Sequence, residues 1–94
     1  MKPTVINILG KSYKISYLEL EEDDGLCKNK ESEIDIDKNL EGIELVHTLL
    51  HEYFHGVLFR TGVTQVLSDD IEEVICDSFA TFLVDNGLVK QNTE

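Results

Sequence analysis

Two histidines and a glutamate in the middle of the chain have the spacing of a zinc site. The segment His51-Glu52-Tyr53-Phe54-His55 has the pattern H-E-x-x-H. Residues four apart in a helix lie one turn apart on one face, so both imidazoles can reach one zinc ion. The glutamate lies beside them, where it can hold and deprotonate a water molecule. The pattern therefore predicts His51 and His55 as metal ligands and Glu52 as a general base.

The third zinc ligand is expected from an acidic segment further along the chain. A catalytic zinc takes three protein ligands and leaves a fourth position to water. Glu73 and Asp77 form an E-x-x-x-D pattern, so one can bind the metal while the other hydrogen-bonds a ligand histidine from behind. Glu72 competes for the ligand role, because the start of a helix commonly carries several acids. The residue types alone leave the third ligand open among these three carboxylates.

Four other side chains are weaker candidates for the site. His47 precedes His51 by one helical turn, which advances about 6 Å along the axis, so three histidines in a row do not share one ion comfortably. Cys27 is an alternative as an inhibitory thiolate, and Tyr13 or Tyr17 as a group that stabilises an oxyanion. We expect an exposed or capping role for the histidine and packing roles for the cysteine and the tyrosines.

The composition limits residues 1–94 to one small acidic domain. A chain of 94 residues with 41% hydrophobic residues supplies one core and not two. Eight basic against nineteen acidic residues give a net charge of -11, which repels phosphate backbones and anionic lipid surfaces. The apolar stretches are too short for a membrane span or a secretory signal. We therefore expect a cytoplasmic protein that binds neither nucleic acid nor membrane, with its two cysteines reduced.

Two helices must position the candidate ligands. Apolar residues recur at three- and four-residue spacing over residues 40–60, which predicts a long helix that carries the H-E-x-x-H pattern. Ser68 or Asp69 suits the N-cap of a second helix that runs to about residue 86 and carries the acidic pattern near its start. We expect Gly56 to permit a close approach of the second helix, since glycine has no side chain in the way.

The first part of the chain predicts strands. Residues 4–9 and 13–17 are rich in β-branched and aromatic residues, and the turn at 10–11 makes them a hairpin. In residues 33–37, isoleucines alternate with acids, which places the isoleucines toward the core and the acids toward solvent. Residues 25–27 form a possible second hairpin with this strand. The expected fold is α+β, with a small N-terminal antiparallel sheet of three or four strands packed on two principal helices.

Three segments of the chain resemble the ImmA/IrrE-type metallopeptidases and the related minimal gluzincins. They are residues 34–37 (Ile-Asp-Ile-Asp), 48–55 (Thr-Leu-Leu-His-Glu-Tyr-Phe-His) and 73–80 (Glu-Val-Ile-Cys-Asp-Ser-Phe-Ala), in the order that the family has. The likeness covers residues 25–83, which is most of the chain. It implies a zincin-like minimal core in which a small sheet lies over the active-site helix.

The same resemblance implies a catalytic zinc centre. It implies Zn²⁺ held by the residues that match His51, His55 and Glu73, with Glu52 as the catalytic base. Asp77 is then left to hydrogen-bond a ligand histidine. The activity implied is proteolysis of a protein substrate, often a repressor that controls a mobile element such as a phage, or a stress response.

The substrate is expected along an edge strand, and two other functions remain as alternatives. A protein or peptide substrate would add to the edge strand near Ile34 to Asp37, where Glu33, Asp35 and Asp37 favour basic side chains. One alternative is a catalytically inactive zinc-binding module that binds a partner protein, but Glu52 argues against it, since a structural site needs no general base. The other is an acidic inhibitor that mimics nucleic acid, motivated by the charge of -11.

Overall fold

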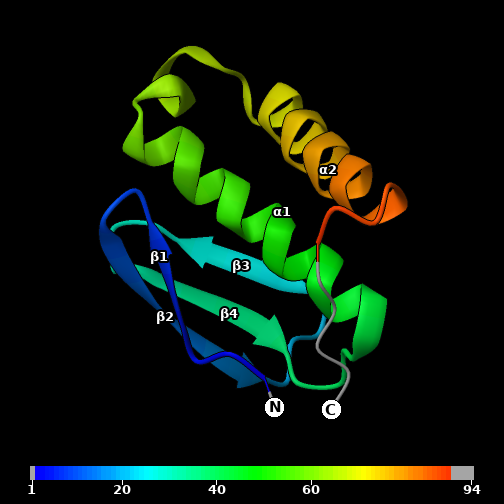
Figure 1. Cartoon of the computed structure of the whole chain (residues 1–94). Helices are drawn as coiled ribbons and strands as arrows, with labels where there is room; N and C mark the ends of the chain where they lie inside the picture. Colours follow the sequence, from blue (N-terminus) through cyan, green and yellow to red (C-terminus); the bar gives the residue numbers. More distant parts are fainter. Residues whose placement is uncertain (1, 90–94) are drawn as a thin grey trace.

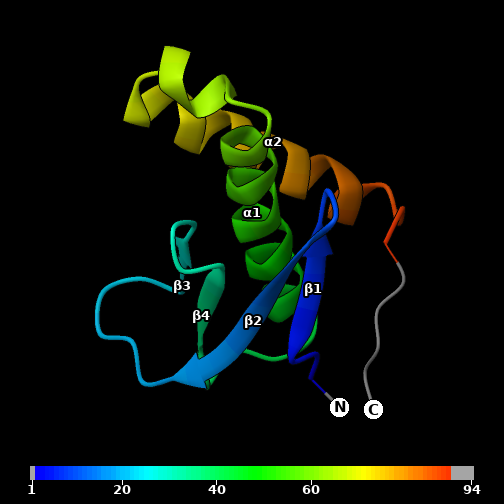
Figure 2. The same cartoon turned by 90° about the vertical axis from the view of Figure 1, so that its left-hand side faces the viewer.

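Four strands come first in the chain and two long helices follow. The computed structural model describes residues 2–89. The elements are β1 (Val5–Ile8), β2 (Lys11–Leu18), β3 (Gly25–Lys28), β4 (Glu33–Asp37), α1 (Gly42–Arg60), the 3₁₀ helix η1 (Val63–Val66) and α2 (Asp69–Asp85). Figures 1 and 2 both show α1 next to the sheet and α2 packed against α1. The predicted α+β class, with an N-terminal sheet and two principal helices, is confirmed.

The sheet has the order β1-β2-β4-β3 and is mixed rather than purely antiparallel. The hairpins β1–β2 and β3–β4 pair antiparallel as expected, but β2 and β4 pair in parallel, with Ile15 opposite Ile34. Consequently β4 lies inside the sheet, and β1 and β3 are its edges. The prediction of an edge strand at Ile34 to Asp37 is wrong. The alternation of apolar and acidic residues indicates which face of a strand is buried, but not whether the strand lies at the edge of the sheet.

The acids of β4 are less available than the sequence indicated. Asp35 is only 6% exposed, and its Oδ2 atom lies 3.2 Å from Nζ of Lys28 on β3. Glu33 contacts the same Lys28 ammonium group at 3.4 Å. Asp37 accepts a hydrogen bond of 3.0 Å from the backbone N–H of Asn39. The three carboxylates that were expected to face a basic substrate are therefore already engaged within the fold.

The core lies between the sheet and α1. Its buried residues come from all the strands except β3: Ile8, Tyr13, Ile15, Ile34 and Ile36, against which Leu45, Leu49, Tyr53 and Val57 of α1 pack. The Tyr13 hydroxyl donates a hydrogen bond of 2.7 Å to Oδ1 of Asn29, and the Tyr17 hydroxyl donates one of 2.6 Å to the carbonyl of Pro3. Both tyrosines thus have the packing roles that were expected of them.

Gly56 faces the sheet and not the second helix. A Cβ atom at this position would lie 2.5 Å from Cδ1 of Ile8 on β1, so the glycine is what lets β1 approach α1. Glu52 lies one turn earlier on the same buried side of α1. The prediction that Gly56 accommodates α2 is wrong, because the face of α1 that meets α2 is the one that carries His51 and His55.

A short connection brings α2 back against α1. Gly62, with φ of 83°, follows the end of α1 and turns the chain into η1. The Ser68 side chain accepts a hydrogen bond of 3.2 Å from the backbone N–H of Ile71, which confirms Ser68 as the N-cap of α2. Neither of these helices, nor any other in the described part of the chain, has both the length and the hydropathy to cross a bilayer.

Candidate metal centre

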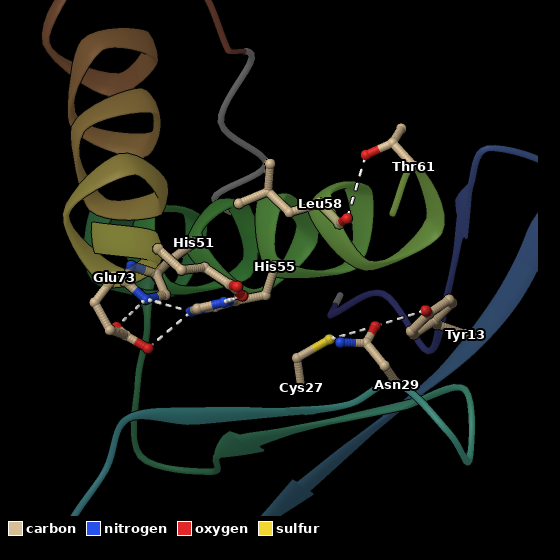
Figure 3. Close-up of polar contacts among 9 residues, drawn as sticks. Tyr13, Cys27, Asn29, His51, His55, Leu58, Thr61 and Glu73 are labelled. Carbon is tan, nitrogen blue, oxygen red and sulfur yellow. Dashed lines mark hydrogen bonds and ion pairs between the residues drawn. The ribbon is translucent and has the colours of Figure 1, made fainter. Parts of the chain in front are cut away.

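Three donor groups from α1 and α2 converge near the start of α2. Nε2 of His51 lies 3.0 Å from Oε1 of Glu73, and Nε2 of His55 lies 3.0 Å from Oε2 of the same carboxylate. The two Nε2 atoms are 3.2 Å apart. Figure 3 shows the Glu73 carboxylate facing both imidazole rings. The structure therefore brings together the two histidines of the H-E-x-x-H pattern and one of the three carboxylates that the sequence left as candidates.

The spacing of these donor atoms fits a metal ion. Ligands that lie roughly 2.1 Å from a tetrahedral ion such as zinc are about 3.4 Å from one another. Each Nε2 atom lies 3.0 Å from a different oxygen of Glu73 and 3.2 Å from the other Nε2 atom, and one donor atom from each residue lies within 4.8 Å of the other two, so a modest shift of the side chains would accommodate an ion. The donor set can hold a metal ion, and it leaves further coordination positions for a water molecule and a substrate.

Glu72 contacts the other ring nitrogen of His55. Oε2 of Glu72 lies 2.6 Å from Nδ1 of His55, and the two side chains are only 11% and 12% exposed. A metal-ligating histidine commonly donates its second N–H to a carboxylate, which fixes the orientation of the ring. With the proton on Nδ1, the lone pair on Nε2 points toward Glu73. From the sequence, Glu72 was considered only as a competing ligand. However, it lies one helical turn before Cys76, which was expected in the core, and this spacing places Glu72 on the same buried face of α2.

Asp77 lies close to His51 without forming a hydrogen bond to it. Its Oδ1 atom is 3.6 Å from Nδ1 of His51 and 3.7 Å from Nε2 of His47, and its side chain is 61% exposed. The partner role expected of Asp77 is thus present only as a longer ion-pair contact. His47 has its shortest contact with Oγ1 of Thr81, at 3.0 Å, and stands apart from the three converging donors. It is half-buried, and not exposed or capping as the sequence suggested.

The two cysteines are buried to different degrees and both are held as thiols. Cys76 is fully buried, as expected, and its Sγ atom lies within 4.8 Å of donor atoms of His55 and Glu72. Cys27 is partly buried, with Sγ 3.4 Å from Oδ1 of Asn29. Burial raises the pKa of each thiol to about 12. A thiolate ligand from Cys27 is therefore disfavoured, since only the ionised form binds a metal well.

Glu52 lies on the sheet-facing side of α1 and is almost completely buried. The residue is 7% exposed, and this burial is the main cause that raises the pKa of its carboxyl group to about 7. The charge of His55 opposes this rise in pKa, and the charges of Glu73 and Asp23 add to it. A carboxyl group with a pKa near neutrality can both accept and return a proton at neutral pH.

Gly25 lets strand β3 pass directly over the Glu52 carboxyl group. A Cβ atom at Gly25 would lie 2.9 Å from Cγ2 of Thr48 and 3.1 Å from Oε2 of Glu52. Any larger side chain would push β3 away from α1. The edge strand and the candidate base are therefore neighbours, although sequence reasoning assigned the strand beside the site to residues 34–37.

A cavity of about 510 Å³ opens beside these groups. One wall comes from α1 and α2, and it contains the converging donors together with Glu52 and Glu72. The rest of the lining comes from residues 23–27 and Asn29. Six carboxylates line the cavity, from Asp23, Asp24, Glu52, Glu72, Glu73 and Asp77, and no lysine or arginine of the described residues does. The cavity is thus suited to a metal ion and to a ligand that carries positive charge.

Comparisons of the chain with protein-family models, with curated proteins and with solved structures found no match. The resemblance to the ImmA/IrrE-type peptidases therefore stays a prediction. The geometry of the cavity and its donor groups carries the functional argument.

Proposed function

We propose that the chain is a zinc-dependent endopeptidase with Glu52 as its general base. The observation that carries this proposal is the convergence of His51, His55 and Glu73 within 3.2 Å of one another, beside a cavity that Glu52 also lines. Two histidines and one glutamate are the ligand set of a well-known class of catalytic zinc sites, in which one coordination position stays open. When bound, zinc polarises the scissile carbonyl and lowers the pKa of the attacking water.

Two glutamates of the chain would carry out proton transfer and orient a metal ligand. Glu52 accepts the proton of the attacking water and then delivers it to the leaving amine. Its pKa of about 7 suits both transfers at neutral pH. Glu72 keeps the His55 ring turned toward the metal through the contact of 2.6 Å at Nδ1. Together these groups form the acid–base and ligand set that peptide hydrolysis requires.

An extended substrate fits the free edge of β3. Within residues 2–89 this strand pairs only with β4, so the backbone groups along its outer edge are available to a peptide that adds as a further strand. Gly25 at the start of β3 lies against Glu52, which puts such a peptide next to the proposed base. The substrate location proposed for the edge strand thus moves from residues 34–37 to β3. A regulatory protein such as a repressor stays the substrate that the family resemblance predicts.

The test combines metal content with cleavage. Zinc-loaded protein is incubated with a mixture of denatured proteins, and new N-termini are identified by mass spectrometry. We expect about one zinc per chain and chelator-sensitive cleavage. Glu73→Ala should lose both zinc and cleavage. Glu52→Gln should keep zinc and lose cleavage by at least about 100-fold, as expected for a general base.

Glu44→Gln is the matched control for Glu52→Gln, because Glu44 is an exposed acid on the same helix and does not line the cavity. This variant should cleave like the wild type. Cleavage that survives in Glu52→Gln, or that persists after the zinc is removed, would contradict the proposal. A zinc-loaded chain that cleaves nothing, but binds a partner protein equally well with Glu52→Gln, would instead indicate a binding module.

A further inference from the structure

Two carboxylates in the lining of the cavity have no cationic partner among the described residues. Asp23 and Asp24 are exposed residues that line the cavity, and neither forms an ion pair with any of the described residues. The next basic residue along the chain, Lys28, already contacts Glu33 and Asp35. The charges of Asp23 and Asp24 are therefore free to act on whatever enters the cavity.

The backbone at Asp24, the second of these two acids, is held by the sheet. The carbonyl of Asp24 accepts a hydrogen bond of 2.8 Å from the backbone N–H of Asp37, and Gly25 pairs with Ile36 in the sheet. A Cβ atom at Gly25 would lie 3.1 Å from Oε2 of Glu52. Asp23 and Asp24 directly precede Gly25. Successive Cα atoms are about 3.8 Å apart, so the Cα atoms of both aspartates lie within about 8 Å of that of Gly25, which contacts Glu52.

Glu52 provides an independent sign that the cavity receives a ligand. The residue is only 7% exposed, its side chain lines the cavity, and it forms no hydrogen bond with the side chain of any described residue. Glu72 differs, because His55 compensates it at 2.6 Å. A buried carboxyl group without a partner in the fold is expected to find one in bound water or in a ligand.

We propose that Asp23 and Asp24 select a substrate with a lysine or arginine side chain close to the cleaved bond. This inference rests on the proposed peptidase function and names its substrate class. A peptide added to β3 would pass these carboxylates next to Glu52, and a cationic side chain there meets two acids at once. Such contacts are stronger in a partly enclosed cavity than on an open surface. Acidic side chains at the same position are repelled.

The experiment profiles cleavage sites in a peptide library that was cut after glutamate, so that lysine and arginine lie inside the peptides. For the zinc-loaded wild type, we expect lysine and arginine to be enriched about tenfold at one position near the cleaved bond. Asp23→Asn with Asp24→Asn should abolish this enrichment while zinc per chain is unchanged. Asp24→Lys should shift the preference toward acidic residues.

Glu21→Gln with Glu22→Gln is the matched control, because it removes the same charge from the same loop outside the cavity. This control should leave the enrichment unchanged. Cleavage without enrichment of lysine and arginine, or an enrichment that survives in Asp23→Asn with Asp24→Asn, overturns this inference and leaves the peptidase proposal standing.

A binding measurement separates this inference from a failure of the peptidase proposal. Capped hexapeptides with a lysine at each position in turn are titrated against the zinc-loaded chain with Glu52→Gln, and the same peptides with norleucine serve as the reference. We expect the best lysine peptide to bind about tenfold more tightly than its norleucine counterpart. If no peptide is cleaved, the peptidase proposal fails. If lysine also confers no tighter binding, the selection by Asp23 and Asp24 is overturned as well.

Discussion

The Nδ1 atom of His55 lies 2.6 Å from Oε2 of Glu72, and both side chains are nearly withdrawn from solvent. The next residue, Glu73, uses both of its oxygens toward His51 and His55. Two adjacent glutamates thus approach the same imidazole from its two nitrogens. One is placed to share a metal ion with the ring and the other to orient the ring.

Removal of the Glu72 charge should weaken metal binding. In Glu72→Gln the His55 ring loses the carboxylate that accepts its Nδ1 proton, and outer partners of this kind contribute about 10- to 100-fold in metal affinity. Zinc affinity is measured by competition with a coloured chelator. Asp70→Asn, an exposed acid in the same first turn of α2, is the control and should bind zinc as the wild type does. Equal affinities for the wild type and Glu72→Gln would show that the contact does not orient the ring.

Glu73 and Asp77 should differ strongly in their effect on zinc. Glu73→Gln removes an oxygen ligand and should weaken zinc binding by more than about 100-fold, because a direct ligand contributes more than its outer partners. Asp77→Asn should change the affinity by less than about threefold, because its contact with His51 is 3.6 Å long and exposed. The same chelator competition measures both variants. A larger effect at Asp77 than at Glu73 would reverse the two roles.

Glu52 should make the metal-free protein less stable as the pH rises. Its pKa is about 7 in the folded chain against an ordinary value of 4.5, so the folded state binds more protons between these two pH values. The free energy of unfolding therefore falls as the pH rises through this range, by up to about 3 kcal/mol from this group. Glu52→Gln removes the effect.

Urea denaturation in the presence of a chelator measures this dependence. At pH 8 the Gln variant should be more stable than the wild type, and the difference should vanish by about pH 4. Parallel pH profiles for the two proteins would mean that Glu52 does not titrate with a raised pKa.

Gly56→Ala should destabilise the fold through one contact. The added methyl group would meet Cδ1 of Ile8 at 2.5 Å, and overpacking of this kind costs about 1–3 kcal/mol. Ile8→Val deletes that carbon atom. In the double variant, the loss of unfolding free energy should be at least about 1 kcal/mol smaller than the sum of the two single losses. The unfolding free energies are measured by urea denaturation. If the losses in the two single variants add up in the double variant, there is no steric contact between residue 56 and Ile8.

The helices, and the spacing of the candidate donors along them, were predictable because the helix itself sets that spacing. His51 and His55 lie one turn apart in any regular helix, and Ser68 is a local signal for the start of α2. The strands that pair with β4 could not be predicted from local spacing. The parallel pairing of Ile15 with Ile34 depends on how two separate hairpins meet, and alternation within each strand carries no information about that.

The distinction between Glu72, Glu73 and Asp77 also needed the structure. All three lie within two turns of one another in the first half of α2, and the rotation of α2 against α1 decides which nitrogen each one reaches. Neighbouring residues on a helix are separated by a rotation of about 100°, so a rotation of α2 by that angle would exchange the roles of Glu72 and Glu73. Residue types alone cannot supply that angle.

The candidate metal donors and the acids of the proposed selectivity site belong to different stretches of the chain. His51, His55 and Glu73 belong to one helical hairpin, whereas Asp23 and Asp24 belong to the loop that leads into β3. Substitutions or insertions in that loop can accumulate during evolution without displacing the ligands. One rigid reaction centre could in this way be paired with many different target sequences, and a protein engineer could redirect it by grafting only a few residues ahead of Gly25.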